Sequence, residues 1–278
     1  MKTNARAQQT RKITSRHNAL VQRARAARDG REPALIFIEG LRLAEEAVAA
    51  ALGIEVAFYT ERIAQDARSA ELLAAFSEAS VRVYEVSESV LDSVADTKSP
   101  QGVVLLARRP HTEQSALETA PADMSLVVIL HRINNPTNAG AMLRVAEAAG
   151  AHGLIATAGT ADLFSSKALR GAMGSAFRLP IWTGAEFAAA LAWCAAHDIE
   201  TVATDLRAAR THTEYDWSVP SAIIIGPEAG GLAADEVSAA VARICIPMRP
   251  PVESLNAATA LAVVLYEAAR QRTEGSGQ

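Results

Sequence analysis

The chain has 278 residues, half of them hydrophobic and about a fifth charged, a composition typical of soluble globular proteins with one large or two modest domains. It contains no apolar run near the roughly 18 residues of a membrane span, and its polar, basic N-terminus has no apolar signal-peptide core. Its two cysteines are too few for a disulfide framework or a cysteine zinc site, so we expect a cytoplasmic protein without a membrane segment.

The net charge of −4 is unevenly distributed along the chain. Residues 1–32 hold nine basic residues against Asp29 and Glu32, a balance of +7, which leaves −11 on the remainder. A basic arm on an acidic body favours contact with phosphate groups, and Arg16 and Arg23 are the arm residues expected to make it. The alternative for this arm is a solvated, frayed terminus.

The first part of the chain alternates between strand and helix patterns. Residues 1–12 have no apolar period and are predicted to form a flexible basic tail. The expected elements are then a helix from about residue 17, a strand over 34–38, a helix over 41–51, a strand over 55–59, a helix over 69–79, a strand over 81–86, a helix over 89–95 and a strand over 102–107. This alternation predicts an α/β domain over 13–109 with mainly parallel strands.

A proline-containing, aperiodic stretch at 110–124 is the expected linker to a second α/β domain over 125–272, which is followed by a tail at 273–278. The expected elements are strands over 126–130, 153–156, 179–182, 201–204, 221–225 and 244–248, with helices over 139–149, 166–173, 185–196 and 257–269. Asn138 is expected to cap the first of these helices. The last helix is apolar around much of its circumference, which suits a core or a dimer interface.

Two strand ends in this second domain lead into loops rich in Gly, Pro and small polar residues. The loops occupy residues 226–231 and 249–256, and ligands bind at such strand ends in open α/β sheets. Glu228 lies in the first loop, Ser254 and Asn256 lie in the second, and Asn138 lies at a third strand-to-helix turn. Each of these residues has an alternative interpretation as a turn or cap residue, but their repeated placement favours a shared pocket.

Three segments together carry a family resemblance. Asn135-Pro136-Thr137-Asn138-Ala139-Gly140 with Arg144, the loop from Gly226, and the stretch from Ile244 to Asn256 resemble the three motifs of the SpoU/TrmH branch of the SPOUT RNA methyltransferases. The N-terminal stretches Ser15–Asn18, Phe37–Gly40 and Ser99–Gly102 resemble the ribosomal-protein-like substrate-binding domain of many members. The resemblance covers the chain from about Ile13 to Arg270.

The resemblance implies an α/β fold in which a parallel-sheet methyltransferase domain with a trefoil knot follows the smaller substrate-binding domain. It implies methyl transfer from S-adenosyl-L-methionine to a ribose 2′-hydroxyl in RNA, by a homodimer and without a metal. Ribosomal (23S) RNA is the expected substrate, and transfer RNA is the alternative. The residues implied as catalytic are Arg144, Asn138, Glu228, Ser254 and Asn256, those implied at the cofactor are Thr204, Asp205, Leu206, Gly226, Ile246, Met248 and Leu255, and Lys167 and Arg170 match a basic RNA-contacting segment.

Arg144 has two interpretations from the residues alone. It either forms a surface ion pair with Glu147, three residues on, or lies at the mouth of the site. The resemblance implies a catalytic arginine here, acting as a base or, since guanidinium stays protonated, as an orienting and charge-stabilising group.

The chain departs from the family pattern at Asn135 and His131, where acidic residues are common, and at Gly171-Ala172, where Ala-Ser is more usual. A catalytically inactive RNA-binding module is a second function class, which the joint presence of the motif residues disfavours. A nucleotide-dependent dehydrogenase or phosphotransferase is a third, and the chain has neither G-x-G-x-x-G nor a P-loop lysine.

Overall fold

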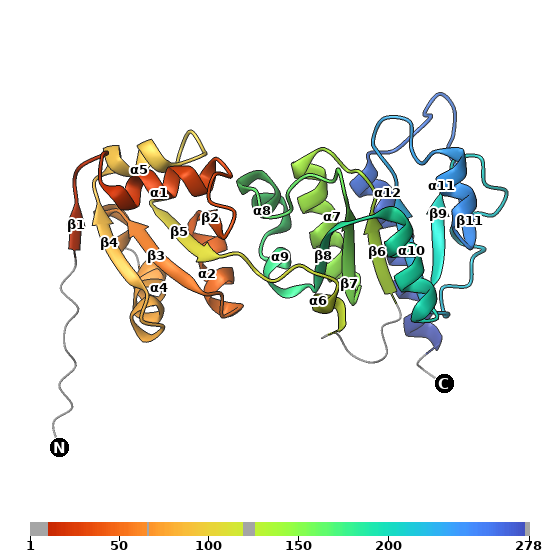
Figure 1. Ribbon diagram of the computed structural model, residues 1–278, viewed down its shortest axis with the longest axis horizontal. Coiled ribbons are helices and arrows are strands. Elements are labelled where there is room, and N and C mark those ends of the chain that lie inside the picture. The colour runs from red at the N-terminus through yellow and green to blue at the C-terminus, as the bar shows by residue number, and fades with distance from the viewer. Residues whose placement is uncertain (1–10, 66, 119–125, 276–278) are drawn as a thin grey trace, which may run out of the picture. The chain divides into compact units, whose positions relative to one another are not determined.

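The computed structural model describes residues 11–65, 67–118 and 126–275, which fold into two compact units (Figure 1). The first unit comprises the described residues up to Pro110 together with Phe164–Leu169, and the second comprises the other described residues. Residues 1–10 of the expected tail, 119–124 of the expected linker and 276–278 at the C-terminus lie outside the described residues. The domain bounds given by the sequence stay predictions.

The first unit is a mixed five-stranded sheet with helices packed on it. Its elements are β1 (Arg11–Ile13), α1 (Ala19–Arg28), β2 (Leu35–Glu39), α2 (Leu41–Ala49), β3 (Ile54–Tyr59), α3 (Glu61–Ala64), α4 (Ala67–Glu78), β4 (Arg82–Val86), α5 (Glu88–Val94) and β5 (Val103–Arg108). The strand order is β1-β4-β3-β5-β2. Apolar side chains of α1 and α5, among them Val21, Ala24 and Leu91, pack against Phe37 and Phe58 of the sheet to form one core.

One expectation for this unit holds only in part, and another is wrong. Of the five described strands, four run in the same direction, but β5 runs antiparallel to both of its neighbours, β3 and β2. An apolar run shows that a strand is buried but does not set its direction. In addition, Arg11 and Lys12 are not part of a tail, because Arg11–Ile13 pairs in parallel with Tyr84–Val86, and Ile13 is buried. Three residues are too few to show a strand period in the sequence. This edge strand could therefore not be predicted, because it forms by pairing with the distant strand β4.

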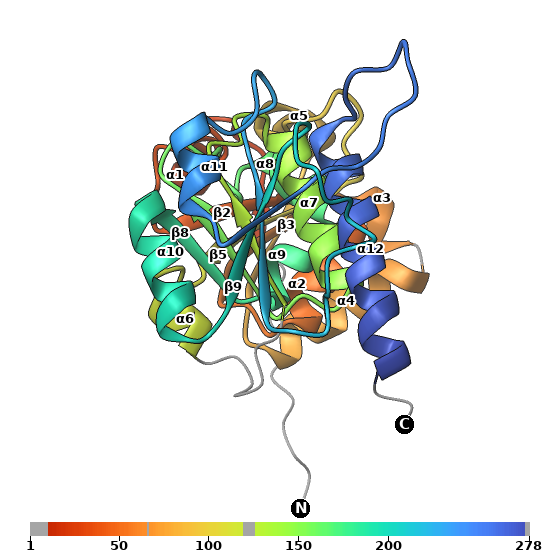
Figure 2. The same ribbon diagram turned by 90° about the vertical axis from the view of Figure 1, so that its right-hand side faces the viewer.

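The second unit is an all-parallel six-stranded sheet in the order β11-β9-β10-β6-β7-β8. Its elements are α6 (Ser115–Glu118), β6 (Leu126–Leu130), α7 (Pro136–Ala148), β7 (Gly153–Thr157), α9 (Ser175–Arg178), β8 (Ile181–Ala185), α10 (Phe187–Ala196), β9 (Glu200–Thr204), β10 (Ser221–Ile225), α11 (Ala234–Ala239), β11 (Ala242–Ile244) and α12 (Ala257–Gly275). The helix α8 (Ser166–Ala172) belongs to both units, because its residues up to Leu169 are part of the first and the rest are part of the second. The helices α10 and α11 cover one face of the sheet, and α7 and α12 cover the other (Figure 2).

The central strands β6 and β10 are buried along their whole length, as continuous apolar runs in a parallel sheet require. The edge strand β11 has only three residues, so the strand expected over 244–248 is shorter and earlier than predicted. Residues 245–256 leave the sheet and cross the carboxyl ends of β9 and β10 before α12 begins. The trefoil knot that the resemblance implies stays a prediction.

The described residues contain no helix long and apolar enough to span a membrane. A search of the same residues for three or more His, Cys, Asp or Glu side chains placed to hold a metal ion finds no such group.

Candidate active site

A cavity of about 650 Å³ lies at the carboxyl ends of β9, β10 and β11. This volume is within the range of about 300–1,000 Å³ found for small-molecule sites, and the position is the one where open parallel sheets bind ligands. All seven residues expected at the cofactor line the cavity, namely Thr204, Asp205, Leu206, Gly226, Ile246, Met248 and Leu255. The sequence places them in three separate segments, at or after the ends of expected strands, and the fold brings these segments around one cavity.

Gly226 shows why one wall of this cavity is made of backbone. A Cβ atom built on Gly226 would lie 2.7 Å from the backbone nitrogen of Leu232 and 2.8 Å from its Cγ. The loop therefore folds back on itself at a distance that only glycine permits. Peptide groups exposed in this way can hydrogen-bond a ligand edge without interposed side chains.

The turn after β9 is fixed by its own hydrogen bonds. The Thr204 hydroxyl donates to the Ile224 carbonyl over 2.9 Å, and the Asp205 N–H donates to the Ile244 carbonyl over 2.9 Å. The Asp205 carboxylate accepts from the Arg207 N–H over 3.1 Å. These contacts hold the three strand ends in register beneath the cavity, so its shape is defined before a ligand arrives.

Asn138, Glu228 and Asn256 form a hydrogen-bonded chain at the mouth of the cavity. The Asn138 Nδ2 donates to Glu228 Oε1 over 3.3 Å, and the Asn256 Nδ2 donates to Asn138 Oδ1 over 3.1 Å. Glu228 also accepts from the backbone N–H groups of Asn134 and Asn135, each over 3.3 Å. One carboxylate thus holds the first turn of α7 against the Gly226 loop, and Asn256 extends the connection to the start of α12.

The expected cap role of Asn138 is wrong. The helix α7 begins at Pro136, and Asn135 caps it by accepting from the Thr137 N–H over 2.9 Å. Proline at the first helical position is pre-organised for this start, which the sequence analysis placed three residues too late. Asn256, in contrast, both caps α12 and contacts Asn138. Its Oδ1 accepts from the Ala258 N–H over 2.9 Å, and its amide nitrogen donates to Asn138. Ser254 lines the cavity next to it with an exposed side chain.

Arg144 is exposed on α7 and does not line the cavity of its own chain. At about 100° per residue, the six steps from Asn138 to Arg144 place their side chains about 120° apart around the helix. The alternative partner Glu147 is bound elsewhere, because Arg178 contacts its two carboxylate oxygens over 2.6 and 2.9 Å. Those hydrogen bonds lower the pKa of Glu147. Within the described residues Arg144 has no hydrogen-bond or ion-pair partner, and its guanidinium is open to a ligand.

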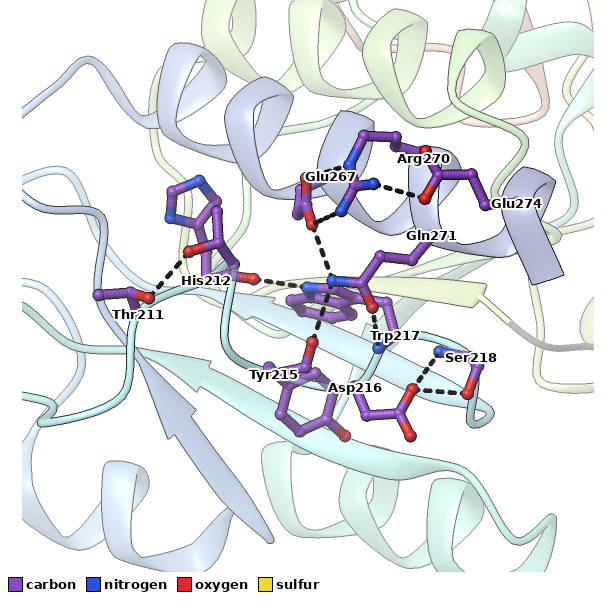
Figure 3. A network of polar contacts seen from close by, with 11 residues as sticks. Thr211, His212, Tyr215, Asp216, Trp217, Ser218, Glu267, Arg270, Gln271 and Glu274 are labelled. Atoms are coloured by element: carbon purple, nitrogen blue, oxygen red, sulfur yellow. Dashed lines mark hydrogen bonds and ion pairs between the residues drawn. The ribbon is translucent and has the colours of Figure 1, made fainter.

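The loop between β9 and β10 is held in place by hydrogen bonds to α12 (Figure 3). Gln271 Oε1 accepts from the Trp217 backbone N–H over 2.9 Å, and its Nε2 donates to the Tyr215 carbonyl over 3.2 Å. Trp217 is fully buried, and its indole N–H donates to the His212 carbonyl over 2.7 Å. Glu267 orients the Gln271 amide and has its pKa lowered to about 2, first by hydrogen bonds from Arg270. A fixed loop keeps Asp205 and Leu206 in place at the cavity.

The four residues expected to contact RNA lie in different surroundings. Arg16 is exposed and donates through Nε to the Ser89 carbonyl over 3.0 Å, whereas Arg23 forms a 3.0 Å ion pair with Glu55. Lys167 is exposed on α8, and Arg170 is half-buried on the same helix. The neighbouring Gly171 has a steric role, since a Cβ there would lie 3.1 Å from the Thr137 carbonyl. That glycine lets α8 approach the first turn of α7.

Two of the three N-terminal segments that carried the resemblance, Phe37–Gly40 and Ser99–Gly102, lie next to one another in the first unit. Glu39 is buried and accepts from the Asp96 N–H over 2.8 Å and from the Thr97 hydroxyl. Gln101 accepts from the Leu41 N–H over 3.1 Å at the start of α2. These residues therefore tie the end of β2 to the loop before β5, a role more specific than a strand-end turn.

Comparisons with known proteins agree with this architecture. The sequence profile of the SpoU rRNA Methylase family matches residues 125–266, and that of the MRM3-like substrate binding domain matches residues 19–105. An uncharacterized tRNA/rRNA methyltransferase of Synechocystis sp. is 32% identical over 95% of each chain. The 23S rRNA (guanosine(2553)-2′-O)-methyltransferase of Bacillus subtilis is 30% identical over 68% of this chain and 73% of its own.

Solved structures resemble the chain over most of its length. An AdoMet-bound rRNA methyltransferase from Sinorhizobium meliloti superposes with a TM-score of 0.82 at 29% identity, covering 94% of this chain and 98% of its own. A structure described as an RNA 2′-O ribose methyltransferase superposes with a TM-score of 0.80 at 32% identity, covering 94% and 99%.

Proposed function

Because the chain belongs to the SpoU rRNA methylase family, we propose that it methylates a ribose 2′-hydroxyl of 23S ribosomal RNA. The coarser activity is that of the family, an RNA 2′-O-ribose methyltransferase that uses S-adenosylmethionine and acts on ribosomal or transfer RNA. The finer choice of 23S RNA is supported by relatives from Bacillus subtilis and Streptomyces viridochromogenes, 30% and 33% identical, whose names specify 23S rRNA 2′-O-methylation.

One observation supports the proposal most directly. The hydrogen-bonded residues Asn138, Glu228 and Asn256 all line the cavity at the strand ends. The cavity has a backbone wall at Gly226 and apolar groups at Ile246, Met248 and Leu255, and this combination fits an adenosine-sized ligand. S-adenosylmethionine supplies a methyl group activated by a sulfonium, and the ribose 2′-oxygen bonds to that carbon as the carbon–sulfur bond breaks.

We assign the site residues distinct tasks in this reaction. Glu228 holds Asn138 and the Gly226 loop together, which fixes the cavity mouth where the ribose must enter. Ser254 and Asn256 offer polar groups to the nucleotide at the same mouth. Arg144 orients the ribose hydroxyl and its phosphate and stabilises the alkoxide charge that develops as the proton leaves, because its guanidinium remains protonated at working pH. Alignment of the two reacting atoms supplies much of the rate enhancement.

We also propose that the enzyme acts as a homodimer through the second unit. Arg144 does not line the cavity of its own chain, because α7 turns its side chain away from Asn138 at the mouth. In a dimer, Arg144 of one copy can instead act at the cavity of the other copy. The helix α12, which packs on α7, exposes 56% of Tyr266 and so has apolar surface for such a contact. A solution mass equal to one chain, measured by sedimentation at micromolar concentration, would contradict the dimer.

Binding of the methyl donor provides the first test. Calorimetric titration is expected to show that S-adenosylmethionine and S-adenosylhomocysteine bind at one site per chain, whereas NAD gives no heat. The reason is that the cavity has backbone donors and an apolar wall, whereas the chain has no G-x-G-x-x-G motif of the kind that holds the pyrophosphate of a dinucleotide. Heat from NAD with none from S-adenosylmethionine would overturn the assignment of the cavity.

A further inference from the structure

Three arginines in the first unit converge on one carboxylate, that of Glu55 at the start of β3. Arg23 of α1 contacts Glu55 Oε2 over 3.0 Å, and Arg108 at the end of β5 contacts Oε1 through Nε over 3.4 Å. Arg82 at the start of β4 donates through Nε to the Glu55 backbone carbonyl over 3.2 Å and places Nη2 3.9 Å from Oε2. Three positive charges therefore surround one negative charge, a local balance of +2 on a chain whose net charge is −4.

The three arginines contact Glu55 to different extents, and Arg82 and Arg108 keep N–H donors that do not bind it. Its best contact is with Arg23, while Arg82 and Arg108 turn mainly their Nε edges towards it. Among the described residues the two terminal Nη groups of Arg108 have no hydrogen-bond partner, and 76% of its side chain is exposed. The side chain of Arg82 is 54% exposed. A guanidinium has five N–H donors in a planar fork, so each of these two residues retains donors for an anion.

The two under-used arginines border a hollow of about 520 Å³ whose other lining comes from Gly53, Ile54, Glu55 and Ser80. The aliphatic part of Arg108 lies beside Gly53, where a Cβ would be in ordinary van der Waals contact with the Arg108 Cδ at 3.4 Å. The Arg108 N–H also donates to the Gly53 carbonyl over 2.9 Å, which fixes the base of the side chain. The hollow thus lies at the ends of strands, and the charged side chains at its rim, Arg82 and Arg108, belong to β4 and β5.

This hollow lies at the opposite end of the sheet from the segments that carried the family resemblance. Glu55 and Arg82 stand at the starts of β3 and β4, and Arg108 stands at the end of β5. Glu39 lies at the end of β2, and Gln101 lies just before the start of β5. Both positions are at the opposite end of the strands from Glu55. Strands of five or six residues separate the two ends by roughly 17–20 Å.

We propose that the hollow between Arg82 and Arg108 binds a backbone phosphate of the RNA substrate, with Glu55 as the residue that positions the two guanidinium groups. A planar fork matches the oxygens of a phosphate, and two forks on a common carboxylate can hold one group from two sides. Burial alone would raise the pKa of Glu55, but the hydrogen bonds from Arg23 and Arg108 lower it, so Glu55 stays charged and keeps them in place. The inference rests on the proposed function, because it names a second RNA contact for the same substrate.

The test is the salt dependence of RNA binding by the full chain. The probe is 23S ribosomal RNA transcribed in vitro, bound to the wild-type protein and to the Arg82→Gln/Arg108→Gln double variant across a series of KCl concentrations. Each lost phosphate contact lowers the slope of log affinity against log salt by about 0.7–0.9. We expect the slope of the double variant to be smaller in magnitude by about 0.7–0.9, because the two arginines hold one phosphate. Its affinity for S-adenosylmethionine should stay unchanged.

Two further variants separate a phosphate site from general electrostatics. Arg210→Gln/Arg243→Gln removes the same charge from exposed positions of the second unit that do not line the cavity, and its salt slope should match that of the wild type. Arg82→Lys/Arg108→Lys retains the charge without the fork, and it should keep most of the slope while binding more weakly. An unchanged slope in Arg82→Gln/Arg108→Gln, or an equal loss in the control pair, overturns the inference. Absence of salt-dependent binding by the wild-type protein would overturn the proposed substrate, and this site with it.

Discussion

Replacing Arg144 with alanine is expected to lower the single-turnover rate of methyl transfer by about 10²–10³, the usual cost of removing one transition-state donor. The affinity for S-adenosylmethionine should not change, because Arg144 does not line the cavity of its own chain. The fold should also be retained, since the side chain is exposed and forms no ion pair within the described part of the chain. Rapid-quench measurement with saturating RNA and cofactor isolates this chemical step.

Two matched variants make the Arg144 result specific. Arg144→Lys should recover little of the rate, because an ammonium group cannot reproduce the planar contact of a guanidinium. Glu147→Gln, one turn further along α7, should methylate at nearly the wild-type rate, since Glu147 is held by Arg178 and such exposed pairs contribute only about 0–1 kcal/mol. Near-normal turnover by Arg144→Ala would remove the residue from the mechanism, and a loss confined to RNA affinity would leave it as a phosphate anchor.

Gly226→Ala is expected to abolish measurable binding of S-adenosylmethionine. The added Cβ would overlap the Leu232 backbone nitrogen at 2.7 Å, so the loop that forms one wall of the cavity must move. Overpacking of this kind typically costs about 1–3 kcal/mol in folding free energy, which a folded domain of this size survives. Calorimetric titration with the cofactor and a thermal unfolding curve, measured on the same sample, report the two effects separately.

The control for Gly226 is Gly184→Ala in β8. Gly184 has a positive φ of 73°, and an added Cβ there meets no atom within 4 Å. Its substitution should therefore cost stability through backbone strain, of order 1–2 kcal/mol, without altering cofactor affinity. If Gly226→Ala bound the cofactor as tightly as Gly184→Ala does, the Gly226 loop would not form part of the cofactor site.

The sequence predicted the alternation of elements and the position of the site because both depend on local patterns. The continuous apolar runs at Leu126–Leu130 and Ser221–Ile225 are buried parallel strands, as expected. The loops after the strands were recognisable from their glycines and small polar residues, and the seven expected cofactor residues line one cavity. Local composition therefore located the loops, whereas the seven cofactor residues follow from the family resemblance, and their role in binding is part of the proposed function.

Other features depend on which distant segments pair, and no local pattern reports that. Asn138 had the right residue type for a cap, but Pro136 starts the helix earlier and frees Asn138 for Glu228, 90 residues away. Glu147 had a plausible partner three residues before it, yet Arg178 of α9 binds it instead. The convergence of Arg82 and Arg108 on Glu55 likewise requires the strand order of the first sheet. In each case tertiary contacts select among partners that the sequence leaves equivalent.

The most direct test of the central claim is identification of the methylated atom. Unmodified 23S ribosomal RNA and transfer RNA, transcribed in vitro, are each incubated with the protein and S-adenosylmethionine carrying a labelled methyl group. The RNA is then digested to nucleosides and analysed by mass spectrometry. The proposed function predicts one labelled nucleoside, with the methyl group on the ribose, from the 23S RNA alone. A methyl group on a base, or ribose methylation of the transfer RNA with none in the 23S RNA, would contradict the account.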